Sequence, residues 1–154
     1  MRLLEMKNVS IHYFTDDGEV CAVNRINLEL EEGETLGLVG ETGAGKTTSA
    51  LGILRLVPDP PGRIIEGEIL YDGKDILKLS NAQMRKIRGR EISMIFQDPM
   101  TSLNPVVTVG EQIIEVIRLH EKISRADAMR KACEILEMVG IPSERLYTVP
   151  QARD

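Results

Sequence analysis

Residues 40–47 read Gly-Glu-Thr-Gly-Ala-Gly-Lys-Thr. This run fits the phosphate-loop pattern Gly-x-x-x-x-Gly-Lys-Thr at every required position. Its glycines let the backbone curl so that successive N–H groups point inward. A helix from Lys46 would add its positive dipole end, Lys46 would bring a full charge to the β- and γ-phosphates, and the Thr47 hydroxyl would ligate Mg²⁺. The alternative is a glycine-rich turn that binds nothing, but this register favours a nucleotide-phosphate site.

The segments on either side of the loop match what a phosphate loop needs. Before it, residues 35–39 form a short apolar run, as expected of a strand covered on both faces. After it, residues 46–56 have apolar side chains at helical spacing, and the prolines that begin at Pro58 end that helix. The pattern predicts a strand–loop–helix unit.

The N-terminal half of the chain is dominated by strand patterns. Residues 3–11 and 20–30 are predicted strands, joined by a turn at Asp16-Asp17-Gly18. Residues 68–71 are a further predicted strand, which leads into the hairpin-type turn Asp72-Gly73.

The second half is dominated by helix starts, with one more predicted strand at residues 92–96. Each helix start is a capping box, a hydroxyl residue followed three positions later by Glu, Gln or Asp. The boxes are Ser80 with Gln83, Thr108 with Glu111, and Ser124 with Asp127. Gly140 is predicted to end the last helix. We therefore predict an α/β protein in which residues 1–104 hold a β-rich subdomain and the phosphate loop, and residues 105–154 form part of a helical subdomain.

The charge and hydropathy of the chain argue against two classes of function. The formal net charge is −5, so the chain as a whole lacks the electrostatic footprint of a nucleic-acid-binding protein. A local basic cluster at residues 85–90 is interpreted mostly as a solvated helix face, and the alternative is a binding patch. No apolar run approaches the length that spans a bilayer, so any link to a membrane is expected to go through a partner protein.

A family resemblance lies in the middle of the chain. Residues 97–105 read Gln-Asp-Pro-Met-Thr-Ser-Leu-Asn-Pro. This segment resembles the Q-loop of ATP-binding-cassette (ABC) ATPases and, among these, the oligopeptide/dipeptide/nickel importer branch. Residues 19–23, 33–41 and 67–73 are similar to the same branch, so the resemblance covers residues 4–147.

The resemblance implies a P-loop NTPase fold of ABC type that binds ATP with Mg²⁺. It places Gln97 at the Q-loop glutamine, which in the family reaches Mg²⁺ and the attacking water; the alternative is a surface turn glutamine. It matches Tyr13 to the aromatic residue that stacks on adenine, although Tyr13 or its neighbour Phe14 could instead be a plain strand residue. The predicted nucleotide contacts are Gly40, Glu41, Thr42, Gly43, Ala44, Gly45, Lys46, Thr47, Thr48 and Tyr13. The predicted Mg²⁺ contacts are Thr47 and Gln97.

The same resemblance implies the partners and the location. The expected partners are ATP, the transmembrane permease subunits of an importer, and a second ATPase subunit in a homo- or heterodimer, with no nucleic acid. The expected location is cytoplasmic, peripheral to the inner face of the cell membrane. The implied activity is ATP hydrolysis that energises the import of peptides or a related solute such as nickel, and the choice of solute is set by other subunits.

The last residues depart from the family pattern. After Tyr147 the sequence runs Thr-Val-Pro-Gln-Ala-Arg-Asp, where the family has Pro-His and then a Ser-Gly-Gly signature. The acidic strand with the catalytic Glu and the switch His have no counterpart, and loss of central strands would leave an exposed apolar edge. We therefore expect the chain to bind Mg-ATP without hydrolysing it at a useful rate. It is either a truncated sequence of an ATPase subunit or a non-catalytic remnant that binds nucleotide or folds poorly.

Overall fold

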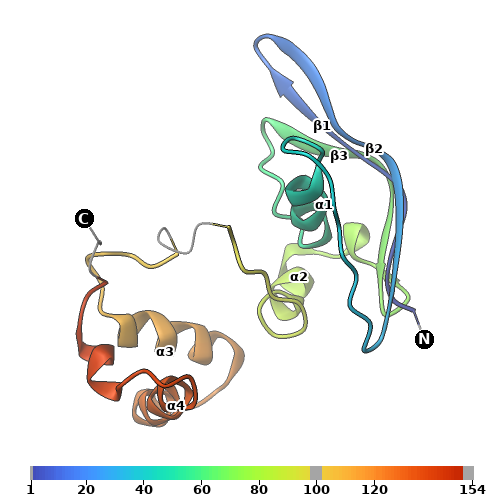
Figure 1. Cartoon of the computed structure of the whole chain (residues 1–154). Coiled ribbons are helices and arrows are strands. Elements are labelled where there is room, and N and C mark those ends of the chain that lie inside the picture. Colours follow the sequence, from blue (N-terminus) through green and yellow to red (C-terminus); the bar gives the residue numbers. More distant parts are fainter. Residues whose placement is uncertain (1, 98–101, 151–154) are drawn as a thin grey trace. The chain divides into compact units, whose positions relative to one another are not determined.

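The structure is a computed structural model that describes residues 2–97 and 102–150. The chain divides into two compact units, Met1–Ile92 and Ser93–Asp154, and each is described by itself (Figure 1). Within the described ranges, no helix is long and apolar enough to cross a membrane.

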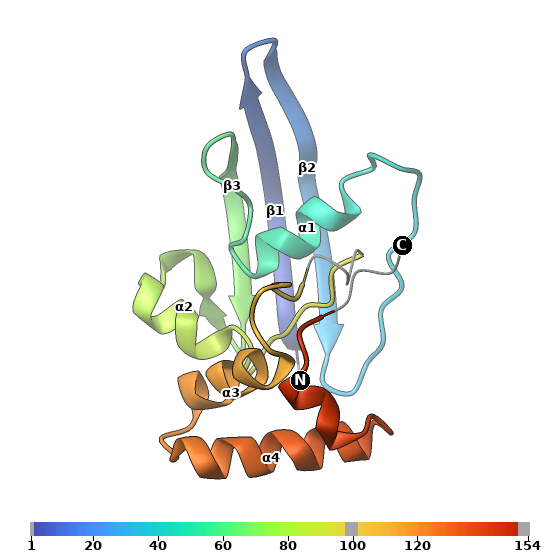
Figure 2. The same ribbon diagram turned by 90° about the vertical axis from the view of Figure 1, so that its left-hand side faces the viewer.

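The first unit is built on an antiparallel sheet with the strand order β2-β1-β3-β4 (Figure 2). β1 (Arg2–Thr15) and β2 (Gly18–Glu31) form a long hairpin whose last pair is Thr15 with Gly18. The two predicted strands and the turn between them are confirmed, and both strands are longer than predicted.

The other edge of β1 pairs with β3 (Gly62–Tyr71), which continues into β4 (Lys74–Asp75). Asp72 and Gly73 connect these two strands with positive φ angles of 47° and 71°. Positive φ at both positions is what the type I′ hairpin turn requires, so the predicted turn is confirmed.

An irregularity at Asn8 keeps one face of β1 apolar along its length. Asn8 has φ 49°, and the pairing register shifts between Met6 and Val9. Met6 and Val9 are both buried although they are three residues apart, because the extra residue turns both to the same face. Opposite the bulge, a Cβ on Gly67 would lie 2.6 Å from the Asn8 carbonyl oxygen, so only glycine fits there.

Three short helices cover the apolar face of the sheet: α1 (Lys46–Ile53), the 3₁₀ helix η1 (Ile76–Lys78) and α2 (Asn81–Ile87). α1 crosses in front of β1 and β2 (Figure 2). A Cβ on Gly52 would lie 2.9 Å from Ile11 Cδ1, so the helix packs closely on the strand. The buried core consists of Leu4, Met6, Val9, Ile11, Val23, Ile69, Ile76 and Met84.

The second unit is helical. It contains α3 (Val109–His120), α4 (Arg125–Met138) and the 3₁₀ helix η3 (Ser143–Tyr147). A Cβ on Gly110 would lie 2.7 Å from the Leu146 carbonyl oxygen, so α3 and η3 are in close contact. The buried core consists of Ile114, Ala128, Ala132, Leu136 and Leu146.

All three predicted helix starts are confirmed. In each, the hydroxyl oxygen of the capping residue accepts a hydrogen bond from the backbone N–H three residues later. The bonds are Gln83 N to Ser80 Oγ at 3.3 Å, Glu111 N to Thr108 Oγ1 at 3.4 Å, and Asp127 N to Ser124 Oγ at 3.1 Å. Gly140, at φ 73°, follows the end of α4 as predicted.

Two predicted strands are wrong. Residues 34–40 have no regular secondary structure, and of residues 92–96 only Ile92 makes an isolated bridge, to Arg88. The apolar side chains of residues 35–39 are exposed, and so are Ile95 and Phe96 in the second run, with 94% exposure for both Val39 and Ile95. Ile92 and Met94 are half-buried. An apolar run becomes a strand only when another segment pairs with it, and no strand of the described residues pairs with either run.

The predicted helix 46–56 is also shorter than expected, because α1 ends at Ile53. Arg55 adopts a left-handed φ of 51°, and the Leu56 N–H donates to the Leu51 carbonyl at 2.8 Å. Leu54 stays buried beyond the helix end. Apolar spacing therefore continues past Ile53 because the terminal turn packs on the core, not because the helix continues.

Candidate nucleotide-phosphate site

The phosphate loop joins an extended segment to the start of α1, and Gly45 is the residue that closes it. Gly45 precedes the helix in the left-handed region, with φ 80° and ψ 3°. A Cβ at this position would lie 2.4 Å from the Ala22 carbonyl oxygen and 3.2 Å from Val23 Cγ2. Both the backbone conformation and the approach to β2 therefore require glycine here.

The N-terminus of α1 leaves three backbone donors for a ligand. The first intrahelical bond of the helix runs from Ser49 N to the Gly45 carbonyl at 2.8 Å, so the N–H groups of Lys46, Thr47 and Thr48 have no intrahelical acceptor. Within the part of the chain that the structure describes, no side chain caps this helix start. Uncapped N–H groups and the positive end of the helix dipole together suit an anion such as a phosphate.

Lys46 folds its side chain back over the loop that precedes it. Its Nζ donates to the carbonyl oxygens of Gly40 and Glu41, both at 2.6 Å. Among the described residues, no carboxylate forms an ion pair with Lys46. The positive charge is therefore held at the loop by neutral oxygens, and it is free to pair with an anionic ligand.

The remaining loop residues shape the turn and expose its outer surface. The Ala44 N–H donates to the Glu41 carbonyl at 3.1 Å, and Gly43 has φ 85°. A Cβ on Gly40 would lie 3.2 Å from Ala44 Cβ, so a larger residue would crowd the loop. The predicted contact residues Glu41, Thr42, Ala44 and Thr47 are exposed, and Thr48 is half-buried.

Tyr13 lies on the same face of the sheet as α1. It follows Ile11 by two positions on β1, and side chains two apart share a face. Gly62 on β3 is the residue that pairs with Tyr13. A Cβ on Gly62 would lie 2.7 Å from Tyr13 Cε1, so the ring packs against that glycine. Phe14 points to the opposite face and is 48% exposed. The geometry therefore puts Tyr13, and not Phe14, on the side of the phosphate loop.

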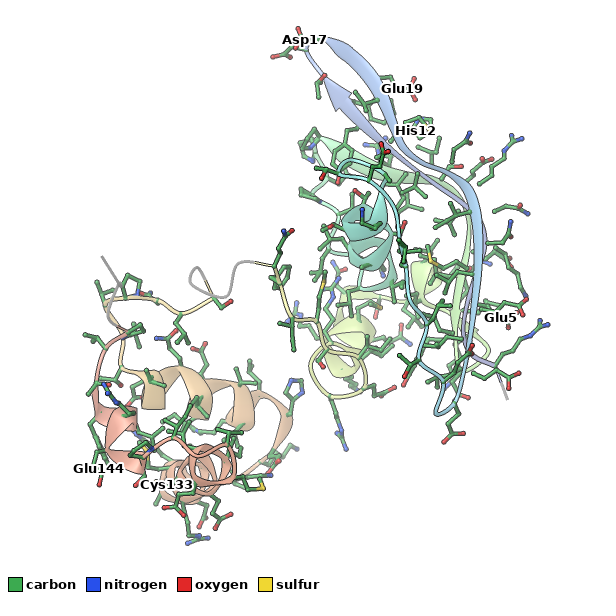
Figure 3. The ribbon with its side chains drawn as sticks, in the orientation of Figure 1. Glu5, His12, Asp17, Glu19, Cys133 and Glu144 are labelled. Atoms are coloured by element: carbon green, nitrogen blue, oxygen red, sulfur yellow. The ribbon has the colours of Figure 1, made fainter. Side chains whose placement is uncertain are left out.

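The opposite face of the hairpin carries a different set of polar groups. His12 Nδ1 is hydrogen-bonded to Glu19 Oε1 across the hairpin (Figure 3). Further along, Ser10 Oγ donates to Glu66 Oε1 at 2.8 Å, and Arg25 Nε donates to the same oxygen at 3.0 Å. These bonds connect the strands of the sheet, so we assign this face a structural role.

Gln97 lies in the second unit and is exposed. The residues that follow it in the Q-loop-like segment, 98–101, lie outside the described residues. Its role toward Mg²⁺ and water stays a prediction, as do the contact roles of the loop residues and Tyr13.

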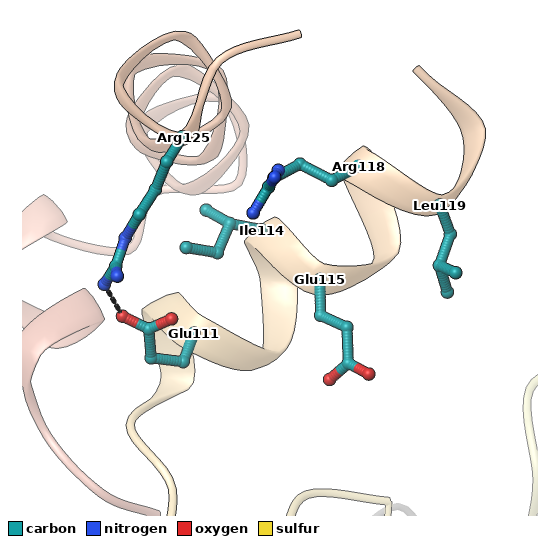
Figure 4. A pocket seen from close by; sticks show the side chains of 6 residues that line it. All are labelled: Glu111, Ile114, Glu115, Arg118, Leu119 and Arg125. Atoms are coloured by element: carbon teal, nitrogen blue, oxygen red, sulfur yellow. Dashed lines mark hydrogen bonds and ion pairs between the residues drawn. The ribbon is translucent and has the colours of Figure 1, made fainter. Parts of the chain in front are cut away.

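The second unit has a hollow of about 400 Å³ over α3 (Figure 4). Arg125 forms an ion pair with Glu111 at its edge. The lining residues are Glu111, Ile114, Glu115, Arg118, Leu119 and Arg125. Two carboxylates balance two guanidinium groups, so this hollow lacks the excess positive charge that a triphosphate needs.

The interpretation of the basic cluster needs a correction. Arg85 and Lys86 are exposed on α2, as expected of a solvated face. Arg88 is half-buried, and its guanidinium donates to the carbonyl oxygens of Leu54 and Arg55, just beyond the end of α1. The sequence could not show these hydrogen bonds, because the acceptors lie more than thirty residues away. Its one hint of a special role was the position of Arg88 at the end of a short helix.

Comparison with known proteins gives a consistent answer. The family described as "ABC transporter" matches residues 23–151. The chain is 53% identical over 141 residues to the oligopeptide transport ATP-binding protein OppD of Bacillus subtilis, covering 92% of this chain and 39% of that protein. It is 45% identical to the Escherichia coli OppD, covering 93% and 42%, and 42% identical to the B. subtilis dipeptide transport protein DppD, covering 97% and 45%. The chain thus spans less than half the length of these relatives.

A solved structure shares the fold. The ATP-binding cassette MJ0796, a dimer bound to ADP and Pi, superposes with a TM-score of 0.79 at 24% identity, covering 98% of this chain and 63% of that one. At this identity the likeness concerns the fold alone.

Proposed function

The chain belongs to the ABC transporter family, and we propose that it is the nucleotide-binding part of an ATP-binding subunit that energises the import of peptides or a related solute. One observation carries the proposal: the uncapped start of α1 and the ammonium of Lys46, which forms no ion pair within the described residues, meet at one loop, on the face of the sheet that also carries Tyr13. The relatives named as oligopeptide and dipeptide transport ATP-binding proteins support the solute class.

Each group of residues suits a different part of Mg-ATP. The N–H groups of Lys46, Thr47 and Thr48 and the Lys46 ammonium suit the phosphates, because all are donors without a carboxylate partner. Tyr13 offers an aromatic face to the base. The exposed Thr47 hydroxyl suits Mg²⁺, which prefers oxygen ligands, and the family resemblance adds Gln97 as a further Mg²⁺ contact. Mg²⁺, when bound, neutralises part of the phosphate charge.

These groups bind and position a nucleotide, but they do not include a general base. Glu41 is the acidic residue among the predicted contacts, and it takes part in the loop through its carbonyl oxygen, which accepts from Lys46 and Ala44. Hydrolysis needs a positioned base or an equivalent group near the attacking water. We therefore propose that the chain by itself binds Mg-ATP and that turnover requires further groups.

The proposal extends to partners and location. The expected partners are transmembrane permease subunits and a second ATPase subunit, and the expected location is the cytoplasmic face of the membrane. The segment after Gln97 and the outer side of α3, with Val116 and Leu119 exposed, are the proposed contacts of the permease.

The test compares Lys46→Ala with Lys86→Ala, which removes an exposed lysine from α2. We expect Mg-ATP at a hundred times its dissociation constant to stabilise the wild type and Lys86→Ala by about 2.7 kcal/mol, if only the folded state binds. Lys46→Ala should lose this effect while its circular dichroism stays the same. An equal thermal shift in all three proteins would overturn the proposed site. Lys46→Ala also serves as the blank when phosphate release from Mg-ATP is measured, which tests whether the chain by itself hydrolyses ATP.

A further inference from the structure

The C-terminal end of α1 is held by the guanidinium group of the residue that follows α2. Arg88 follows α2, and its Nε donates to the Leu54 carbonyl at 2.7 Å while Nη2 donates to the Arg55 carbonyl at 2.8 Å. Leu54 and Arg55 are the first two residues after α1, where carbonyl groups lack intrahelical donors. Burial lowers the pKa of Arg88, and the charge of Arg55 lowers it further. One planar side chain thus satisfies two carbonyls in a partly dry site.

Arg55 extends the same connection. Its Nη1 donates to the Leu79 carbonyl at 2.6 Å and to the Ile76 carbonyl at 3.3 Å. Ile76 is the first residue of η1 and Leu79 follows its last residue, so Arg55 is tied to η1 by its side chain and to Arg88 by its backbone carbonyl. The end of the helix is therefore located by two guanidinium groups, not by apolar packing alone.

The backbone at Arg88 is itself fixed. The Gly89 N–H donates to the Ile92 carbonyl at 2.8 Å, and the Ile92 N–H donates to the Ile87 carbonyl at 3.1 Å. Arg88 also forms a bridge with Ile92. These bonds hold the backbone of Arg88 in a closed turn. The Arg88 side chain therefore reaches the end of α1 from a fixed point of attachment.

α1 has eight residues and is about 12 Å long, so its two ends move together. One end carries the uncapped N–H groups of the phosphate loop, and the other accepts from Arg88. A cation at the C-terminus also interacts favourably with the helix dipole. Between these ends, Gly52 is in close contact with Ile11 of β1.

We propose that Arg88 is a positioning residue for nucleotide binding: its two hydrogen bonds fix the C-terminal end of α1 and thereby hold the N–H groups at the other end in place for the phosphates. The inference rests on the proposed function, because it concerns the same loop. It also assigns a role to the basic cluster, in which Arg88 acts on the loop without touching the ligand.

The experiment compares Arg88→Gln with Arg85→Gln, which removes an exposed arginine from α2, three residues earlier. Two quantities are measured for each chain: the dissociation constant of Mg-ATP by calorimetry, and amide hydrogen exchange along the backbone without nucleotide. For Arg88→Gln we expect affinity to fall about tenfold, as for residues that influence a site without touching its ligand. Exchange should quicken in residues 40–53 and stay unchanged in β1 and β3. Arg85→Gln should match the wild type in both.

A purely structural role predicts a different result, with faster exchange throughout the first unit. Arg88→Lys keeps the charge but cannot bridge two carbonyls with a rigid fork, so its affinity should fall between wild type and Arg88→Gln. This variant replaces Arg88→Gln if the latter does not fold. Wild-type affinity and exchange in the Arg88 variants would overturn the inference and leave the proposed function standing. Failure of the wild type to bind Mg-ATP would overturn the proposed function itself.

Discussion

Gly45 is the residue at which the phosphate loop approaches the sheet most closely. Substitutions at three glycines separate the two reasons why glycine is required there, the left-handed backbone and the contact with β2. Gly45→Ala meets two penalties: a left-handed φ of 80°, and a Cβ placed 2.4 Å from the Ala22 carbonyl oxygen. Gly43→Ala meets only the first, because φ is 85° and nothing lies within 4 Å of the added Cβ. Gly37→Ala meets neither.

The magnitudes follow from these penalties. The left-handed conformation costs an alanine roughly 1–2 kcal/mol. Overpacking against β2 adds roughly 1–3 kcal/mol, since Cβ atoms do not approach other atoms within 3.0 Å without a shift. We therefore expect the free energy of unfolding to fall by about 1–2 kcal/mol in Gly43→Ala and by about 2–5 kcal/mol in Gly45→Ala. Gly37→Ala should stay within about 0.5 kcal/mol of the wild type.

The assay is urea unfolding followed by circular dichroism, with Mg-ATP affinity measured on the folded chains. Gly45→Ala should also lose more affinity than Gly43→Ala, because the shift that relieves the contact moves the first N–H groups of α1. Equal losses of stability at positions 43 and 45 would refute the argument that the Ala22 carbonyl determines where the loop can lie.

Two further predictions concern the two faces of the hairpin. Tyr13→Ala should weaken Mg-ATP binding by about 1 kcal/mol, whereas Tyr13→Phe and Phe14→Ala should be nearly silent in calorimetry; a loss confined to Phe14→Ala would mean that the wrong face of β1 had been assigned to the base. On the other face, hydrogen bonds from Ser10 and Arg25 lower the pKa of Glu66 below its usual 4.5. Because the pKa is lower in the folded state, ionised Glu66 stabilises the folded protein above about pH 4.5. This stabilisation is lost as the pH falls through the folded-state pKa of Glu66. In urea unfolding at a series of pH values, Glu66→Gln should therefore be less stable than wild type at about pH 6 and approach it as the pH falls below the folded-state pKa of Glu66. A difference that persists at low pH would contradict this origin.

Predictions agreed with the structure where the sequence signal and the structure that it specifies lie within a few consecutive residues. The three capping residues start helices as predicted, and Asp72-Gly73 forms the predicted tight turn. In each case the donor, the acceptor and the required backbone angles come from residues only a few positions apart.

The predictions that failed depend on distant segments. Residues 35–39 and 92–96 have the composition of buried strands, but strand formation requires hydrogen bonds from a neighbouring strand, and composition cannot supply that neighbour. Arg88 was interpreted as a solvated residue for the same reason, since its acceptors at Leu54 and Arg55 follow a different helix.

The sequence by itself determined where the predicted phosphate loop lies: the spacing of its glycines, Lys46 and Thr47 indicates phosphate binding, and loop and helix start are contiguous. Only the tertiary structure decided which side chains share a face with that loop. Simple alternation from Leu4 and Met6 would put Tyr13 on the opposite face of β1, but the bulge at Asn8 inserts one residue and reverses the alternation. That bulge depends on the close approach of Gly67 from β3, a contact between residues almost sixty positions apart.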